Sequence, residues 1–557
     1  MDVELAAWAL RNARTHAPDP THRPQARVAS AFDGTPAVHR AQVGRWESGR
    51  VAITYPLVRR YEVLLGYPEG AIQCLIDCLH RAAAPIRATA TVPELGPVDV
   101  AATIGLIELA LSEERMTGLD WYRLSGNLGR TPTAMLRTRD WKALLERCAL
   151  EMAVSLDLEY ALRDEALGRL AGHPQSGPVI AAMAAKLLRS PHAQVYSDTV
   201  ELTMYCGHPD VVAVLLEQVR HPLNDDALRA ALGALTSILR GGRASPEIVR
   251  ETVRYALGFV RDVQRPPRIR RQSANLLRAL NLPGKQRLAA GLSAHDLRDA
   301  ATILLEGRSL DRSRLRTMTD RVRAALASDT HTHSQTHLDP VLERVVRTAL
   351  EDTDDIARTA AVRVLMLAPQ RSTVATALAR DLDEHRARDD WDAVLEYLEV
   401  LVSLARAEDL DVVVDLLTDA QTRPDLALLS GIVVGNATDP DRARLSRRHD
   451  RIHQRAVHLI EDPVTALSGH DTHEQARQIL KGLVYPLGIA GRFELIADLR
   501  RRLPALHAAP REQSRAGAAQ VESPADVAPL ATGVCDWWLS LPGHVRPGPM
   551  FATAQID

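Results

Sequence analysis

Near its start the chain has a segment in which apolar and basic positions fall on opposite sides of a helix. At 100° per residue, His39, Val43 and Trp46 lie on one side, where they can anchor the helix to a small core. The other side carries two arginines with two small residues between them: Arg40, Ala41, Gly44 and Arg45. Small residues let a helix backbone approach a surface closely while the guanidinium groups reach outwards, which suits the major groove of DNA.

The ends of this helix, and a helix on each side of it, can be read from the same region. Thr35 offers a side-chain N-cap and Pro36 suits the first helical position, whereas Gly49 is a typical helix end. Residues 23–32 predict a shorter preceding helix. Residues 54–68 predict a following helix, whose expected inward residues are Leu57, Tyr61 and Leu64.

The middle of the chain predicts helix after helix, with short breaks at Gly, Pro, Asp and His. The stretch RDEALGRLAGHP, which begins at Arg163, returns 35 residues later as DTVELTMYCGHP. Helix pairs that recur about every 35–45 residues indicate an α-solenoid, because each pair buries its apolar face only against its neighbours. The region resembles HEAT or armadillo repeats in degenerate form; an irregular all-helical domain is the alternative.

These patterns predict an all-α protein in four parts. We expect a DNA-binding domain over residues 1–84, a linker over 85–100, a helical repeat domain over 101–502 and a tail over 503–557. The tail is rich in Ala and Pro, so we expect it to be flexible. Its end contains Trp537 and Trp538, which are costly to expose and are expected to dock on the body or on a partner.

The distribution of charge along the chain indicates that any nucleic-acid site is confined to a small part of it. The chain has a net charge of −2, but residues 21–60 hold seven arginines against Asp33 and Glu47, a local net charge of +5. Only four of the 68 basic residues are lysines, which is typical of a GC-rich genome such as an actinobacterial one.

Three parts of this region together carry a family resemblance: QARVA from Gln25, VGRWESGR from Val43 and the Tyr-Glu-x-Leu-Leu-Gly run at 61–66. They resemble the xenobiotic-response-element (XRE) helix-turn-helix family related to lambda repressor and Cro. The family's third helix reads bases and ends in a pattern that residues 44–49 match at five of six positions. Gly44 departs from it by replacing the usual Ser, and residues 33–37 look like an insertion.

The resemblance implies that Gln25 touches a DNA phosphate at the start of the second helix. Together with the helical pattern it predicts groove contacts from Arg40 and Arg45 and phosphate contacts from Arg27 and Arg50. The complete expected DNA-binding set is Gln25, Arg27, Arg40, Ala41, Gly44, Arg45 and Arg50.

Other chemistry is weakly indicated. Two histidine groups have spacings that a metal could use: His331, His333 and His337 with Asp329 and Asp339, and His449, His453 and His458. A polar loop explains the first group better, and a solvated basic helix face explains the second. No phosphate loop, dinucleotide fingerprint or nucleophile elbow is present, so we expect no enzyme, cofactor or metal.

The five cysteines are scattered and odd in number, as in a reducing cytoplasm, and no apolar run approaches the roughly 18 residues of a spanning helix. We therefore expect a cytoplasmic transcriptional regulator that binds double-stranded DNA at an inverted-repeat operator as a homodimer. The repeat domain would bind a ligand or protein partner. The alternative is an interaction scaffold in which the helix-turn-helix is only a docking module.

Overall fold

The computed structural model describes residues 3–32, 38–83, 98–131, 136–190, 200, 202–206, 208–242, 244–281, 283–295, 297–308, 310–328, 338–419, 423–437, 441–466, 473–503 and 524–547. Within these ranges all regular structure is helical and no strand occurs, which confirms the predicted all-α class. None of the described helices is both long enough and apolar enough to cross a membrane.

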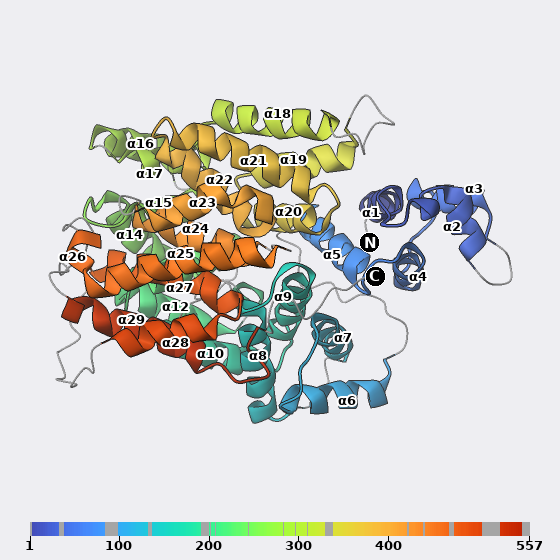
Figure 1. The fold of residues 1–557 in the computed structure, drawn as a ribbon, viewed down its shortest axis with the longest axis horizontal. Coiled ribbons are helices and arrows are strands. Elements are labelled where there is room, and N and C mark those ends of the chain that lie inside the picture. The colour runs from blue at the N-terminus through green and yellow to red at the C-terminus, as the bar shows by residue number, and fades with distance from the viewer. Residues whose placement is uncertain are drawn as a thin grey trace. The chain divides into compact units, whose positions relative to one another are not determined.

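The chain forms two compact units (Figure 1). The first contains residues 1–152, 156–176 and 312–377, so the N-terminal helices share a unit with helices from the middle of the sequence. Its helices are α1 (Val3–Thr15), the 3₁₀ turn η1 (Pro20–His22), α2 (Gln25–Ala31), α3 (Arg40–Glu47), α4 (Tyr55–Leu65), α5 (Ala71–Ala83), α6 (Val100–Leu111), α7 (Gly118–Gly129), α8 (Thr138–Ala153), α9 (Asp157–Ala171), α18 (Arg312–Ser328), α19 (Pro340–Glu351) and α20 (Asp355–Leu367). The boundary between the units runs through α21 (Arg371–Arg386).

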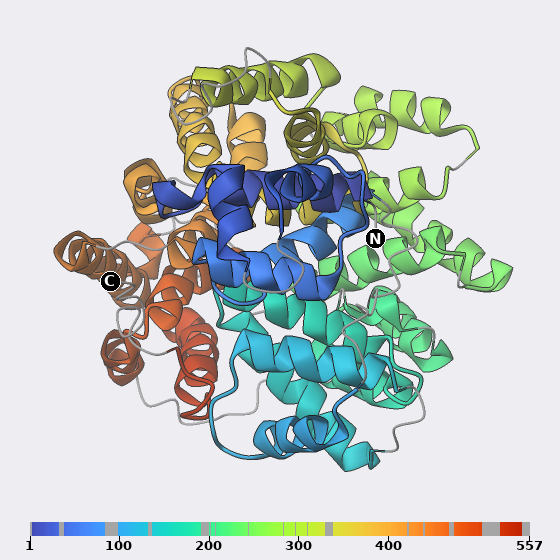
Figure 2. The ribbon, with the colours of Figure 1, turned by 90° about the vertical axis from the view of Figure 1, so that its right-hand side faces the viewer.

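Helix α5 is the centre of the first unit, and it is buried on every side. All residues from Ile72 to Leu79 are buried, because α5 packs against α1, α4, α9 and α20. Figure 2 shows the N-terminal helices, in the blue colours, grouped together and facing the viewer. The carboxylate of Glu62 fixes where α5 begins, since it accepts hydrogen bonds from the backbone N–H groups of Gly70, Ile72 and Gln73 at 2.8–3.0 Å.

Two charged residues of α5 are buried and paired. Asp77 accepts a hydrogen bond from Tyr55 at 3.0 Å and one from Tyr122, and its second oxygen lies 2.9 Å from Nη2 of Arg169 on α9. One turn later Arg81 pairs with Glu165 of α9 at 2.5 Å. Burial raises the pKa of Asp77, although Arg169 acts in the opposite direction. Through the core, these contacts connect α4, which is the helix that follows α3, to both α7 and α9.

The second unit contains residues 153–155, 177–311 and 378–557. Its helical elements are α10 (Gly177–Leu188), η2 (Leu202–Tyr205), α12 (Pro209–Arg220), α13 (Asp225–Arg240), α14 (Pro246–Arg261), α15 (Pro267–Ala279), α16 (Lys285–Ala294), α17 (Arg298–Glu306), α22 (Trp391–Leu404), η4 (Ala407–Asp409), α23 (Asp411–Thr418), α24 (Pro424–Asn436), α25 (Arg442–Glu461), α26 (Pro463–Ala466), α27 (His473–Ile489), α28 (Phe493–Arg502) and α29 (Pro524–Leu539). Helices α24 and α27 cross at Gly431 and Gly482, where a Cβ on Gly431 would lie 2.0 Å from the Gly482 carbonyl oxygen.

The C-terminal segment corrects one expectation. Residues 524–539, most of which were assigned to a flexible stretch, form α29, since Ala is a strong helix former and Pro524 stands at the helix start. Trp538 is 0% exposed and packs on Gly488 of α27, with its ring 5.9 Å from that of Tyr485. The tryptophan therefore docks on its own chain.

The buried pair on α5 makes a testable contribution to stability. Arg169→Leu leaves the Asp77 carboxylate without its cation, so we expect unfolding in urea to require about 3–5 kcal/mol less free energy. Adding Asp77→Asn removes the buried charge and should restore a large part of that loss. Arg139→Leu, at an exposed site on α8, should change stability by less than about 0.5 kcal/mol. Equal effects of Arg169→Leu and Arg139→Leu would show that the pair has no such role.

Candidate nucleic-acid interface

Helix α3 forms where the sequence predicts a helix, but it begins later than expected. Its first residue is Arg40, and His39 before it is an extended N-cap residue with φ −93° and ψ 152°. Thr35 and Pro36, the predicted start, lie outside the described residues. His39 is exposed, so its assignment to the inward side is wrong; one residue before the helix, it does not follow the helical periodicity.

The inward side of α3 is anchored by apolar and aromatic contacts. Val43 is fully buried, and Trp46 is half-buried between Phe32 and Tyr61, at ring-centroid distances of 5.4 and 6.3 Å. The expected inward face of α4 is confirmed at Tyr61, which is fully buried, but it is shifted by one residue at the two leucines. Leu57 and Leu64 are half-buried, whereas Val58 and Leu65 are buried, because α4 turns that side towards α5.

Glu47 ties the end of α3 to three other helices. Its carboxylate lies 2.6 Å from Nε and 2.9 Å from Nη2 of Arg14 on α1, and it accepts a hydrogen bond from the side-chain amide of Gln25 on α2 at 2.8 Å. Tyr61 of α4 donates to it at 3.4 Å; burial and the Glu47 charge raise the pKa of Tyr61, so the hydroxyl remains protonated. A buried carboxylate in this position fixes how α3 is oriented against α1 and α2.

From the sequence, Glu47 was expected only as a negative charge and as one of the matched positions of the family pattern, not as a buried contact between helices. The available signal was its position four residues after Val43, which places an acidic residue on the inward side of a short helix. Such a residue needs a buried cation, but α1 was not predicted, so Arg14 was not recognised as the partner.

The outward side of α3 has the predicted composition. Arg40, Ala41 and Arg45 are exposed, and so is Arg50 just after the helix. Gly49 has φ 71°, the left-handed conformation that favours glycine at a helix end. Within residues 25–32 and 38–50 the sole acidic residue is the buried Glu47, so every exposed charge there is positive.

Four of the arginines near α3 differ from the others in having no partner. Among the described residues, no side-chain hydrogen bond or ion pair engages Arg27, Arg40, Arg45 or Arg50. By contrast, Arg59 pairs with Glu69 at 2.8 Å, Arg60 lies over the Phe32 ring, and Arg23 donates to the carbonyl of Ala17. The partnerless four are the arginines in the predicted DNA-binding set.

Gln25 lies beside Gly44 of α3. It is the first residue of α2, and its amide lies 3.8 Å from the position that a Cβ on Gly44 would take. One amide N–H is engaged by Glu47, and the second hydrogen on the same nitrogen is available to a phosphate. A serine would fit at position 44 for the same geometric reason, so glycine is not required there by packing.

The histidine groups are placed differently from each other. Residues 329–337 lie outside the described residues, while Asp339 caps α19 and pairs with Arg11 at 2.5 Å. The solvated basic face expected around His449 is wrong in part: Arg448, His449 and Arg455 are buried, although His458 is exposed. Arg448 pairs with Asp411 at 2.8 Å, and His453 lies 3.2 Å from Asp498. No group of three potential metal ligands occurs in the ranges that the structure describes.

His449 predicts a pH dependence of stability. Burial, with help from Arg492 and Arg448, lowers the pKa of His449 from 6.5 to about 4. Between these values the unfolded chain binds a proton that the folded chain does not. The contribution of neutral His449 to the free energy of unfolding is therefore fully present above pH 6.5. It falls by up to about 3 kcal/mol as the pH decreases towards 4.

The second unit's helices are unfolded in urea at pH values from 7 to 4.5. The free energy of unfolding should decline less steeply with falling pH in His449→Asn than in wild type. His458→Asn, at an exposed position on the same helix, should leave this decline intact. Identical slopes for wild type and His449→Asn would contradict the assignment.

A scan of the sequence against protein-family models and a comparison with curated proteins found no match. The functional argument therefore depends on the residues and their geometry.

Proposed function

We propose that the protein is a sequence-specific DNA-binding transcriptional regulator, and that α2 and α3 are its helix-turn-helix. The observation that carries this proposal is the set of four exposed, partnerless arginines around α3, in segments (residues 25–32 and 38–50) that hold no exposed acidic residue. Phosphate neutralisation requires such a local positive surface. Arginine is also the side chain that most often bonds guanine in the major groove.

The proposed division of labour follows from position. Arg40 and Arg45 stand on α3 beside Ala41 and Gly44, so they reach base edges while the backbone approaches the groove. Arg27 on α2 and Arg50 after α3 hold phosphates, and Gln25 contributes its remaining amide hydrogen. The contacts of Glu47 with Arg14 and Gln25 support this function, because they fix the position of α3, which carries the base contacts.

The rest of the chain is proposed as a HEAT-like helical repeat that senses a ligand or protein partner. The contacts of α5 support such coupling within the first unit, since α5 packs on α1 and α4 and also on α9 and α20. A partner that changes the packing of α9 or α20 would act on the helices that hold α3. By linkage, DNA would change the affinity for that partner by the same factor.

The decisive variant is Arg40→Ala/Arg45→Ala. An operator is first obtained by selecting bound duplexes from a random pool. Two lost base contacts, each worth about 1–3 kcal/mol, should then weaken binding to that operator by at least about 30-fold in a gel-shift assay. Circular dichroism should be unchanged, because both side chains are exposed.

The matched control is Arg137→Ala/Arg139→Ala, which removes the same charge from exposed positions at the start of α8. It should bind the operator like wild type. Undiminished binding by the α3 double variant would overturn the proposed interface. A wild-type protein that enriches no sequence from the pool would favour the alternative, an interaction scaffold.

Arg27 should affect affinity without affecting sequence preference. Arg27→Ala removes one neutralised phosphate per domain, so the slope of log K against log salt should become shallower by about 0.9 per domain. Operator and random duplexes should lose affinity equally. Ser30→Ala, at an exposed site on the same helix, should leave the slope unchanged. A loss confined to the operator would instead make Arg27 a base contact.

A further inference from the structure

Helix α6 exposes an apolar face although both of its ends are fixed. Seven large apolar side chains are strongly exposed among the described residues, and three of them lie on α6: Val100 at 66%, Ile104 at 51% and Leu111 at 44%. Ile107 is half-buried between them. The four positions are spaced by four, three and four residues, so they form one continuous seam along the helix, as in a coiled coil.

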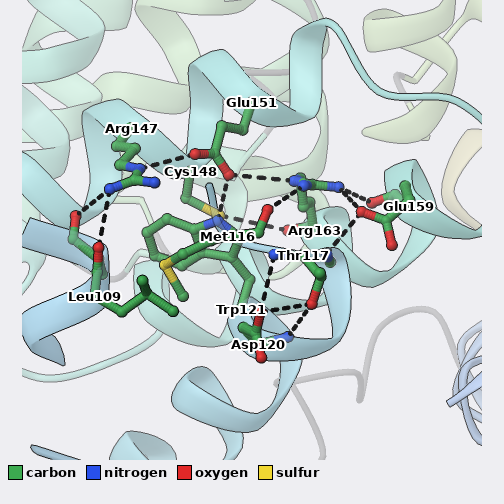
Figure 3. Close-up of polar contacts among 12 residues, drawn as sticks. Leu109, Met116, Thr117, Asp120, Trp121, Arg147, Cys148, Glu151, Glu159 and Arg163 are labelled. Atoms are coloured by element: carbon green, nitrogen blue, oxygen red, sulfur yellow. Dashed lines mark hydrogen bonds and ion pairs between the residues drawn. The ribbon is translucent and has the colours of Figure 1, made fainter. Parts of the chain in front are cut away.

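The exposed seam does not belong to a loosely attached helix. At the N-terminus Asp99 caps the helix by accepting from the N–H of Ala102 at 3.0 Å. On its packed side Thr103 accepts from Asn127 of α7 at 2.9 Å. At the C-terminus the guanidinium of Arg147, which pairs with Glu151, donates to the carbonyls of Leu109, Ala110 and Ser112 at 2.6–3.1 Å (Figure 3).

Arg147 is itself buried, so the last turn of α6 is held by a group that cannot move far. The backbone under the seam is therefore fixed, and ordering it costs little further backbone entropy when a partner binds.

We infer that α6 is the contact between two copies of this chain, packed antiparallel across a two-fold axis at the middle of the helix. The seam has the symmetry that such an axis requires. Val100 would lie opposite Leu111 of the second copy, and Ile104 opposite Ile107, so each apolar residue meets an apolar residue.

For a pair of these helices, charge favours the antiparallel direction over the parallel one. Glu108 is the one charged residue within α6, and Asp99 caps its start. In a parallel pair the two Asp99 and the two Glu108 side chains would lie side by side. In the antiparallel pair each Glu108 lies near the N-terminal turn of the other helix, where the helix dipole favours a negative charge.

Area sets the strength of the contact. A 12-residue helix is about 18 Å long, and one face of it buries well below the roughly 800 Å² per partner of a standard interface. The dimer should therefore be weak in free solution, with dissociation at tens of micromolar or above. Neighbouring DNA half-sites would hold two copies at millimolar effective concentration, so that nearly all bound copies would be dimeric. The tryptophan end of the chain is an unsuitable alternative, because Trp538 is already buried.

This inference rests on the proposed function and specifies the homodimer expected from the sequence. Its test uses no DNA, so the two can fail separately. Sedimentation equilibrium of the full chain at up to about 200 µM should show self-association. Val100→Glu/Ile104→Glu should weaken it by at least tenfold. Val263→Glu, at a 58% exposed valine of the second unit, should leave it unchanged.

Cysteine cross-linking tests the direction of packing. All five native cysteines are buried, so an introduced thiol on α6 is the accessible one. A mixture of Val100→Cys and Leu111→Cys copies, one of them carrying a size tag, should form the mixed disulfide dimer. Val100→Cys alone should not, because its two copies would be about 16 Å apart, beyond the reach of about 7 Å for a disulfide.

Three outcomes would overturn the inference. One is a wild-type chain that stays monomeric at the highest concentration, even if its α6 binds a different protein. A second is self-association that the glutamates on α6 do not weaken. The third is rapid cross-linking of Val100→Cys with itself, which would require parallel helices.

Discussion

A helix that is buried on all sides can carry a charge only if its neighbours supply the opposite one, and α5 carries two. Asp77 and Arg81 project from α5 into the core, where Arg169 and Glu165 of a single helix, α9, meet them. Because an unpaired buried charge costs several kcal/mol, this requirement fixes the register of α9 against α5. Tyr55 and Tyr122 extend the same constraint to the start of α4 and to α7. The position of the candidate interface thus depends on a polar contact made one helix away from it.

The many arginines of this chain fall into two physical classes. Arg14, Arg81, Arg147 and Arg169 are buried, and each is paired with a carboxylate. The four around α3 are exposed and hold nothing within the described chain. Amino-acid composition does not show which arginine belongs to which class, because the difference depends on burial and on whether an acidic side chain lies close enough to pair.

Periodicity was sufficient to locate α3 and α4 and, apart from His39, to assign the two sides of α3, since each depends on residues three or four apart. It failed where long-range contacts decide. Leu57 and Leu64 look like the inward residues of α4, but the requirement to place Tyr61 near Glu47 and Glu62 near the start of α5 shifts the buried face by one position. The same limit hid Arg14, Asp77 and α29, whose roles depend on residues far away in the sequence. The partnerless state of Arg40 and Arg45 was equally invisible before the ion pair of Arg59 and the hydrogen bond of Arg23 to the Ala17 carbonyl were known.

The pairing across α5 also bears on how such a chain can arise. A recombination event that cut after residue 83 and joined the first five helices to another helical array would strand Asp77 and Arg81 in a core without Arg169 and Glu165. The product would fold poorly unless the incoming array brought an arginine and an acid at matching positions on one helix. The N-terminal helices therefore depend on α9 and could be moved to another chain only together with it.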